Sequence, residues 1–365
     1  MDSLPLIYDL NLPALTDLLS NWGEPSYRAN QIWQGLYRQY WTAPDQFTSL
    51  PKSLRESLTE HFQNQLIDGK PSLSALSPIT VLESSDGETR KTLFSLPDHR
   101  PIEAVLMSYA HRQTLCISTQ SGCAMGCVFC ATGQMGFGRH LSSGEIVEQV
   151  LYYARQLVAQ GKVVTNVVVM GMGEPFHNYD ATLAAIDRLS DPQGMKLGAR
   201  RFTISTVGLV PAIQKFAARR SQINLAVSLH AAEDELRSRL LPINKKYPLA
   251  QLMDACREYI SLTHRRISFE WALINGVNDT PEQAKLLASL LQTLRQSGTL
   301  LAHVNAIPLN PTDRYPHQAT PHQRAVTFQK ELENLGIPCT IRLRRGIDIQ
   351  AGCGQLAGSS LDLHP

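Results

Sequence analysis

Long apolar runs are missing from this sequence. The longest, near Val167–Met172 and Leu286–Leu291, fall far short of the roughly 20 residues that a membrane-spanning helix needs. The first basic residue is Arg28, which comes after three aspartates, the reverse of the basic start of a signal peptide. We therefore expect a cytoplasmic protein without a membrane segment.

The sequence also lacks a large excess of charge of either sign. It has 34 Lys and Arg and 32 Asp and Glu, which gives a net charge of +2. This balance neither identifies nor excludes a nucleic-acid binder, because a local basic face matters more than the sum. With 365 residues and 43% hydrophobic residues, the chain can bury a sizeable core in two or three domains, which excludes wholesale disorder.

Cysteines are few, and their number is odd: the chain has 7, of which three lie within Cys123–Cys130. An odd, clustered set is a poor framework for disulfides and a good pattern for a metal site. This usage fits a reducing cytoplasm.

The pattern of apolar residues divides the chain into three regions. Residues 1–76 show only helical spacing and predict a small all-helical domain, which we expect to contact RNA if the protein binds it. In residues 77–108, the runs Lys91–Leu96 and Ile102–Met107 flank a turn and predict a connecting β-hairpin or small sheet. Residues 109–365 alternate between strand and helix.

The alternation predicts a parallel sheet with crossover helices, and thus an α/β fold that resembles an open or partial (β/α)6 barrel more than a closed eightfold one. Capping signals place the starts of three helices after Ser142, Thr280 and Thr320. The expected strands are Thr114–Thr119, Asn166–Gly171, Arg201–Thr206, Ile223–Leu229, Arg266–Leu273, His303–Pro308 and Thr340–Arg344.

The strongest chemical signal is the triad Cys123, Cys127 and Cys130 on one loop after the first of these strands. Three thiolates at this spacing can hold three irons of a four-iron cluster and leave the fourth open to another ligand, as catalytic sites do. The spacing favours an iron–sulfur cluster over the alternatives, which are a zinc site completed by a distant His or Cys, or three unrelated buried thiols.

Polar residues recur where the expected strands end, which is where active residues of such barrels lie. Alone, a Ser or Asn after a strand is usually a turn residue, and a His usually a hydrogen-bonded packing residue. Six such positions at one rim are harder to explain by turns alone. They are Cys123–Cys130, Gly173-Glu174, Ser205, Ser228–His230, Asn310 and Cys353.

Four segments carry a resemblance to a known family. Cys123–Phe137 (CAMGCVFCATGQMGF), Gly171–Pro175 (GMGEP), Tyr27–Tyr37 and Arg345–Leu356 together resemble the RlmN-type RNA methyltransferases of the radical S-adenosylmethionine superfamily. The resemblance covers essentially the whole chain, and slight departures at Gly352 and in a variable stretch remove no functional group. It implies methylation of C2 of an adenosine in 23S ribosomal RNA and in transfer RNAs.

The resemblance also implies two cofactors. A [4Fe-4S] cluster would be held by Cys123, Cys127 and Cys130, and S-adenosylmethionine by a second set of residues. A carboxylate in that set suits the cofactor's ammonium group, and hydroxyl and amide groups suit its ribose and carboxylate. The set comprises Gly173, Glu174, Ser205, Ser228, Leu229, His230 and Asn310.

The resemblance also implies catalytic roles for Cys116 and Cys353. Carbon 2 of adenine is too electron-poor to attack a sulfonium methyl group. In the family, a first S-adenosylmethionine methylates Cys353 and a second supplies a 5′-deoxyadenosyl radical that activates this methyl group. Cys116 then releases the product through a Cys116–Cys353 disulfide, and Glu103 is treated as a proton acceptor. From the residues alone, Cys116 is a core thiol, Cys353 a surface thiol and Glu103 a solvated charge.

Cys256 and Cys339 are expected to be packing residues. Aromatic and basic residues interleave in the helical region and could contact RNA, although Trp33 suits a helix core better. The resemblance further implies an electron donor such as flavodoxin or ferredoxin, and a monomer. Two alternatives stay open: C8 methylation of the same ribosomal adenosine, and a non-catalytic, zinc-stabilised RNA-binding protein.

Overall fold

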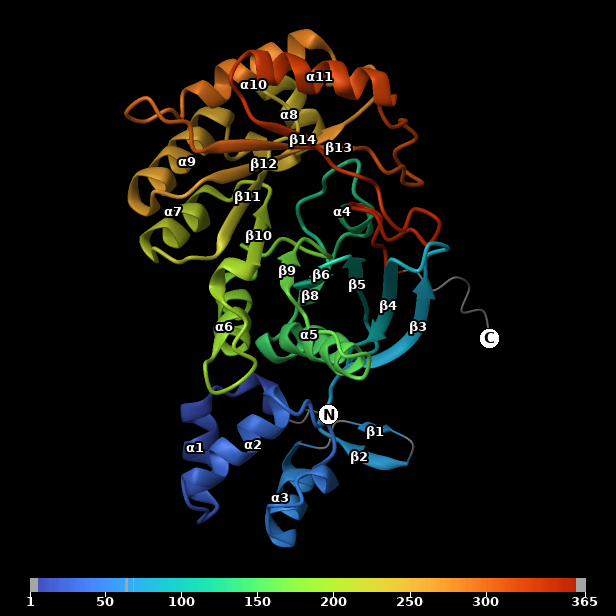
Figure 1. Ribbon diagram of the computed structural model, residues 1–365, viewed down its shortest axis with the longest axis vertical. Helices are drawn as coiled ribbons and strands as arrows, with labels where there is room; N and C mark the ends of the chain where they lie inside the picture. Colours follow the sequence, from blue (N-terminus) through green and yellow to red (C-terminus); the bar gives the residue numbers. More distant parts are fainter. Residues whose placement is uncertain (1–5, 63–64, 68, 359–365) are drawn as a thin grey trace.

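The computed structural model describes residues 6–62, 65–67 and 69–358. The start of the predicted first domain and the end of the predicted last domain therefore lie outside the described residues. Its centre is a ten-stranded sheet in the order β14-β13-β12-β11-β10-β9-β6-β5-β4-β3 (Figure 1). All seven expected parallel strands are present, with ends shifted by a few residues. They are β6 (Arg112–Cys116), β9 (Asn166–Val169), β10 (Phe202–Thr206), β11 (Asn224–Ser228), β12 (Ile267–Leu273), β13 (Ala302–Pro308) and β14 (Cys339–Ile341).

Helices connect the successive parallel strands, as the alternating pattern predicts. The sheet does not close, because β14 and β3 are its two edges in the described chain, and the open α/β barrel expected from the sequence is confirmed. The crossover helices are α5 (Ser143–Val158), α6 (Tyr179–Ser190), α7 (Val210–Ala218), α9 (Leu249–Thr263), α10 (Pro281–Gln292) and α11 (His322–Asn334), and the short α8 (Asp234–Leu240) precedes α9.

Two of the three predicted helix caps form. The Ser142 side chain accepts from the backbone N–H of Glu145, whose carboxylate accepts from the Ser142 N–H, and Thr280 accepts from Gln283. The prediction that Thr320 caps the third helix is wrong, because α11 begins after Pro321 and has no side-chain cap. Thr320 instead donates to the buried carboxylate of Asp279 (2.9 Å), because a tertiary partner competes for its hydroxyl.

The N-terminal region is mostly helical, with α1 (Leu12–Asn21), α2 (Tyr27–Tyr37) and α3 (Lys52–Phe62). The expectation of a purely helical region is wrong, because β1 (Gln65–Ile67) and β2 (Lys70–Ser72) form a small antiparallel pair. Strands of three residues are too short to show the alternation by which a sequence reveals a strand.

The predicted hairpin is present as β4 (Thr89–Ser95) and β5 (Pro101–Tyr109), and β3 (Ser77–Glu83) adds a third antiparallel strand, which agrees with the alternative of a small sheet. This hairpin continues the main sheet, because β5 pairs antiparallel with β6. It therefore forms one wall of the barrel interior.

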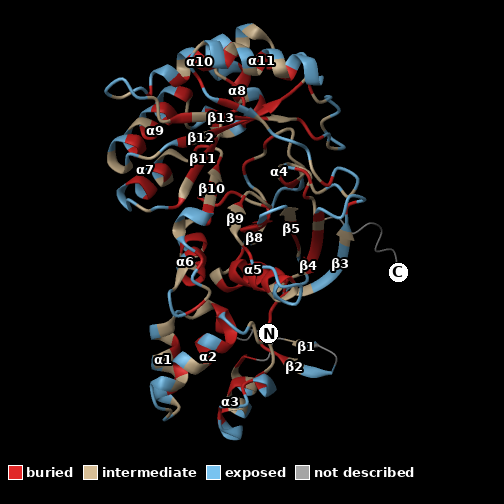
Figure 2. Cartoon of the chain, viewed as in Figure 1, coloured by how far each residue is buried: buried red, intermediate tan, exposed pale blue. Residues whose placement is uncertain are grey.

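Buried residues lie along the strands and on the helices that cover them (Figure 2). The apolar side chains of the N-terminal helices belong to the same core. The short 3-10 turn Ile7–Asp9 adds polar contacts: Asp9 accepts from the N–H of Gly144 at the start of α5 (2.6 Å), and Arg188 of α6 donates to the carbonyl of Tyr8. No helix in the described ranges is long and apolar enough to cross a membrane.

Candidate active site

The three clustered cysteines lie on a tight loop between β6 and α4 (Ala131–Met135). Two short strands, β7 (Gln120–Gly122) and β8 (Phe137–His140), pair around the loop, and the N–H of Cys123 donates to the carbonyl of Gly136 (2.8 Å). Gly122 has a φ of +75°, and a Cβ there would collide with that same carbonyl. Glycine is thus required for the loop to fold back on itself.

The three thiols lie close enough to one another to interact electrostatically. Cys127 is buried, and Cys123 and Cys130 are half-buried. Burial raises the pKa of Cys123 to about 12 and also raises the pKa of Cys127, and the neighbouring thiols add to both shifts. Gathered thiolates are unfavourable here unless positive charge compensates them, which iron would supply.

No group of three or more His, Cys, Asp or Glu side chains in the described part of the chain is arranged to hold a single metal ion. Three cysteine thiols on one loop are the type of donor that iron–sulfur clusters use. The donor set therefore fits an iron–sulfur cluster.

Glu174 lies buried beyond the end of β9. Its carboxylate accepts from the backbone N–H groups of Phe176 (3.0 Å) and Val207 (2.9 Å), and its own N–H donates to Gln120 (2.8 Å). Burial raises the pKa of Glu174 to about 7. Gly173 permits this approach, since a Cβ there would stand 2.5 Å from the side chain of Gln120. An ammonium group would be a suitable partner for this carboxylate.

Ser205 and Ser228 end neighbouring strands, with 3.4 Å between their hydroxyl oxygens. Leu229 is buried beside them, and His230 adopts a left-handed φ of 58°. The His230 Nδ1 accepts from the N–H of Ala272 (2.9 Å), and burial lowers the pKa of this imidazole to about 3. The ring is therefore neutral, with its proton on Nε2.

Asn310 follows β13 and connects the rim to the C-terminal segment. Its Nδ2 donates to the carbonyl of Cys353 (3.1 Å), while its buried Oδ1 has no hydrogen-bond partner among the described residues. Since buried polar atoms are nearly always paired, this oxygen fits a ligand that donates a hydrogen bond, as a hydroxyl of the expected cofactor would.

The C-terminal segment brings Cys353 to the cysteine loop. The N–H of Ala131 donates to the carbonyl of Gly354 (2.8 Å), and the Thr132 hydroxyl donates to that of Leu356 (2.5 Å). Cys353 is accessible, yet protein surrounds its thiol closely enough to raise its pKa to about 12. Cys116, Cys130 and Glu270 contribute to this shift, in that order. Residues far apart in the sequence thus meet at one opening.

Cys116 ends β6, opposite Val105 of β5 and Val168 of β9. It is half-buried, whereas its neighbours Leu115 and Ile117 are buried in the core on the other side of the sheet. All seven cysteines are free thiols in the structure, so the disulfide that the resemblance implies is not formed. Cys256 and Cys339 are buried in α9 and β14, away from this opening.

Glu103 is not a solvated charge. It is buried on β5, where its carboxylate pairs with the ammonium group of Lys91 (3.0 Å). The residue-level expectation was wrong because the partner lies on the neighbouring strand, which a single sequence does not reveal.

Arg237 of α8 is a functional candidate that no motif or spacing in the sequence indicates. It is fully buried, and its guanidinium group donates to the carbonyls of Val207 (2.7 Å), Ser228 (3.2 Å) and Leu229 (3.2 Å) and to the side chain of Asn244 (2.8 Å). It joins the ends of β10 and β11, the loops that carry several of the expected ligand-binding residues.

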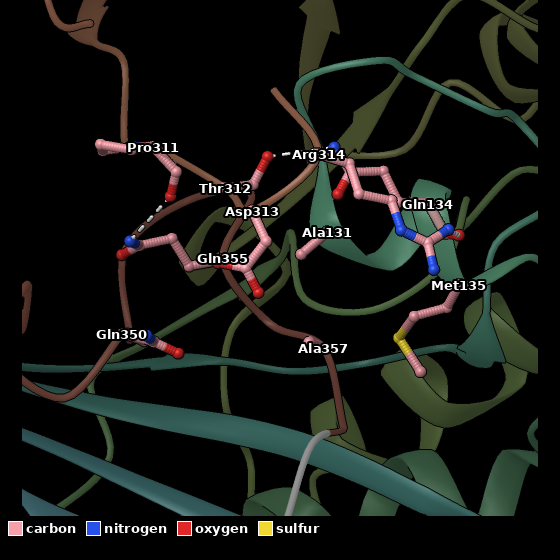
Figure 3. Close-up of a pocket in the computed structure, with 10 residues that line it drawn as sticks. All are labelled: Ala131, Gln134, Met135, Pro311, Thr312, Asp313, Arg314, Gln350, Gln355 and Ala357. Atoms are coloured by element: carbon pink, nitrogen blue, oxygen red, sulfur yellow. Dashed lines mark hydrogen bonds between the residues drawn. The ribbon is translucent and has the colours of Figure 1, made fainter. Parts of the chain in front are cut away.

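A pocket of about 170 Å³ opens beside the cysteine loop and the C-terminal segment (Figure 3). Planar amide and guanidinium groups form part of its wall. Arg314 donates to the carbonyl of Gln134 (3.0 Å), which fastens the loop after β13 to α4. The lining residues are Ala131, Gln134, Met135, Pro311, Thr312, Asp313, Arg314, Gln350, Gln355 and Ala357.

In the N-terminal helices, Trp33 and Tyr37 are buried, and Tyr37 therefore does not belong to an RNA-facing surface. Trp33 packs in the core as its spacing suggested. Tyr27 is exposed, with the Arg28 guanidinium over its ring (4.9 Å).

Comparisons with known proteins agree with this geometry. Residues 117–288 match the family model of the Radical SAM superfamily, and residues 6–63 match that of the ribosomal RNA large subunit methyltransferase N-terminal domain.

The chain is 51% identical to a "Probable dual-specificity RNA methyltransferase RlmN" of Chloroflexus aurantiacus, over 96% of this chain and 92% of that one. It is 48% identical to the "Dual-specificity RNA methyltransferase RlmN 1" of Myxococcus xanthus, over 97% and 95%. A crystal structure of a radical SAM methyltransferase from Sphaerobacter thermophilus superposes with a TM-score of 0.91 at 47% identity, over 97% of this chain and 100% of that one.

Proposed function

Because the chain belongs to the RlmN family of RNA methyltransferases in the radical SAM superfamily, we propose that it methylates C2 of an adenosine in 23S ribosomal RNA and in transfer RNA. The observation that carries the proposal is the seating of the Cys353 segment against the cysteine loop, where the N–H of Ala131 donates to the carbonyl of Gly354 (2.8 Å). A methyl carrier must reach both the radical source and the thiol that later releases it.

The cysteine loop and the strand ends are the proposed cofactor sites. Cys123, Cys127 and Cys130 would hold a [4Fe-4S] cluster. Gly173, Glu174, Ser205, Ser228, Leu229, His230 and Asn310 would hold S-adenosylmethionine. When bound, these groups supply the methyl group and the one-electron chemistry that removes a hydrogen atom from a methyl carbon. The raised pKa of Glu174 fits this role, since a bound ammonium group would stabilise the carboxylate that burial disfavours.

Cys353 is the proposed methyl carrier. Its sulfur accepts the methyl group and later presents the activated carbon to C2 of the adenine. Burial raises the pKa of both Cys353 and Cys116 to about 12, so each thiol must lose its proton before it attacks.

Cys116 is the proposed resolving thiol. After C2 has lost its proton and the radical adduct has lost its odd electron, which a bound cluster would accept, the Cys116 thiolate attacks the sulfur of Cys353. The bond between that sulfur and the transferred carbon breaks, a disulfide forms, and the released electron pair takes up a proton to complete the methyl group of the product. A thiol reductant returns the two electrons before the next turnover.

The RNA surface is proposed from chemistry and position. The amide and guanidinium groups of the pocket in Figure 3 suit the edges of unpaired bases, and the pocket borders the Cys353 segment. The helical region of residues 1–76 is the proposed docking domain, followed by the connecting strands of residues 77–108 and the catalytic barrel of residues 109–365. A monomer served by a flavodoxin- or ferredoxin-type electron donor in the cytoplasm completes the proposal.

Replacing the resolving thiol tests the proposal directly. With Cys116→Ala, the reaction should stop at a covalent protein–RNA adduct through Cys353, which denaturing electrophoresis and mass spectrometry of the Cys353 peptide would detect. Cys256→Ala is the matched control, because that buried thiol lies on α9 and should leave turnover unchanged. Free, fully methylated RNA from Cys116→Ala would contradict the mechanism.

The position of the methyl group needs a separate measurement. Nucleoside digestion of wild-type product followed by mass spectrometry should yield 2-methyladenosine. A product carrying 8-methyladenosine would replace the C2 assignment. Stoichiometric zinc without iron in the purified protein, together with normal RNA binding by Cys353→Ala, would contradict catalysis altogether.

A further inference from the structure

Lys91 and Glu103 form a buried ion pair beneath the Cys353 segment. The ammonium nitrogen of Lys91 stands 3.0 Å from the Glu103 carboxylate, and both side chains are almost fully buried. Buried pairs of this kind are costly unless further hydrogen bonds satisfy the remaining donors and acceptors. The other hydrogen bonds of Lys91 and Glu103 therefore show which part of the chain this ion pair holds.

The remaining bonds all go to the C-terminal segment. Lys91 donates to the carbonyl of Gln350 (3.3 Å), which precedes Cys353. Glu103 accepts from the N–H groups of Ala357 (2.9 Å) and Gly358 (3.3 Å), which follow it. One ion pair thus holds both ends of the segment that carries Cys353.

Strand register explains why this position suits Cys353. Lys91 of β4 lies opposite Val105 of β5, and Val105 lies opposite Cys116 of β6. Paired residues project from the same face of a sheet, and Glu103, two residues from Val105, projects from that face as well. The ion pair and the resolving thiol therefore share one surface, onto which the C-terminal segment folds.

We propose that Lys91 and Glu103 are positioning residues that clamp the Cys353 segment over Cys116. The proposal rests on the role of Cys353 given above. It assigns Glu103 to holding the segment, because its two carboxylate oxygens are engaged by Lys91 and by two backbone N–H groups of that segment.

The test measures the mobility of the segment in the reconstituted holoenzyme under anaerobic conditions. Glu103→Gln and Lys91→Met remove one charge each and keep much of the side-chain volume. Glu83→Gln is the matched control, because it breaks a more exposed ion pair with Arg90 between β3 and β4. Circular dichroism and cluster absorbance would verify that each variant folds.

Both clamp variants should increase the rate of Cys353 alkylation by iodoacetamide by about ten-fold, because the segment opens more often when its bonds are lost. Amide hydrogen exchange should accelerate at Ala357 and Gly358, while Glu83→Gln matches the wild type in both measurements. The double variant should exceed neither single variant, since the pair acts as a unit. With RNA, kcat should fall and KM should change little.

Three outcomes separate the possibilities. Unchanged alkylation and exchange in both clamp variants would overturn the clamp. Lost methylation by Glu103→Gln with unchanged Cys353 mobility would also overturn it and would favour direct proton transfer by Glu103. If wild-type protein methylates no RNA, the proposed function fails, yet the alkylation and exchange measurements still decide whether the clamp exists.

Discussion

Arg237 shows how much one side chain contributes to the rim. Its guanidinium group is buried among oxygen acceptors, three of which are backbone carbonyls at the ends of β10 and β11. Burial lowers the pKa of Arg237 to about 10, so the side chain stays charged at neutral pH. A buried cation that depends on these carbonyls fixes their positions in return.

Arg237→Met should lower the free energy of unfolding by about 3 to 5 kcal/mol, because several charge-assisted hydrogen bonds are lost and buried carbonyls are left unpaired. Urea denaturation of the cofactor-free protein measures this change. Arg239→Met is the matched control, because Arg239 is exposed on the same helix, and its effect should stay within about 0.5 kcal/mol. Equal effects of the two substitutions would contradict this role of Arg237.

At the scale of elements, helix starts depend on local and tertiary bonds together. At the start of α5, Ser142 and Glu145 cap each other, and Arg139 joins the Glu145 carboxylate (2.8 Å) to Asp98 (2.7 Å) in the turn between β4 and β5. The cap thereby links the helix to the wall that carries Glu103.

Ser142→Ala should lower the free energy of unfolding by about 1 kcal/mol, since the N–H of Glu145 loses its acceptor. Ser142→Asn should recover most of this loss, because asparagine caps helices about as well as serine. Thermal or urea unfolding of the three proteins checks the order, and equal stability of Ser142→Ala and the wild type would show that the cap contributes nothing.

Most of the fold could be predicted because it depends on local periodicity. The seven parallel strands and the caps at Ser142 and Thr280 follow from apolar spacing and from residues near in sequence. The predicted cap at Thr320 was wrong, because the partner of its hydroxyl, Asp279, is distant in the sequence. The burial of Glu103 was missed for the same reason, since its partner Lys91 lies on another strand. The cysteine loop was readable from spacing alone, whereas Arg237 resembles any basic residue on an exposed helix.

At the scale of the whole molecule, the helical N-terminal region and the barrel meet at a buried carboxyl group. Glu148 of α5 accepts from the N–H of Ala75 (2.8 Å), in the connection between β2 and β3. Burial raises the pKa of Glu148 to about 8 from a reference value of 4.5. The folded chain therefore keeps a proton that the unfolded chain has lost, and stability must fall as pH rises through this interval.

The free energy of unfolding of the wild type, minus that of Glu148→Gln, should decrease between pH 5 and pH 8 and then level off. The amide carries no charge and supplies the matched reference, so the difference isolates this one group from all other titrations. Urea denaturation at several pH values measures the difference. A difference that is constant with pH, or that rises, would contradict the assignment.

The two free edges of the sheet, β14 and β3, have a mechanical consequence. The span from Arg345 to Gly358 crosses from one edge toward the other, and its contacts with the β3–β5 wall include those of Arg345 with Glu88 and of Asp348 with the N–H of Ser85 (2.8 Å). Both contacts are made by side chains, so they can break without the loss of any backbone hydrogen bond between strands of the sheet. Release of these side-chain contacts would therefore leave the hydrogen-bonded sheet behind the segment intact.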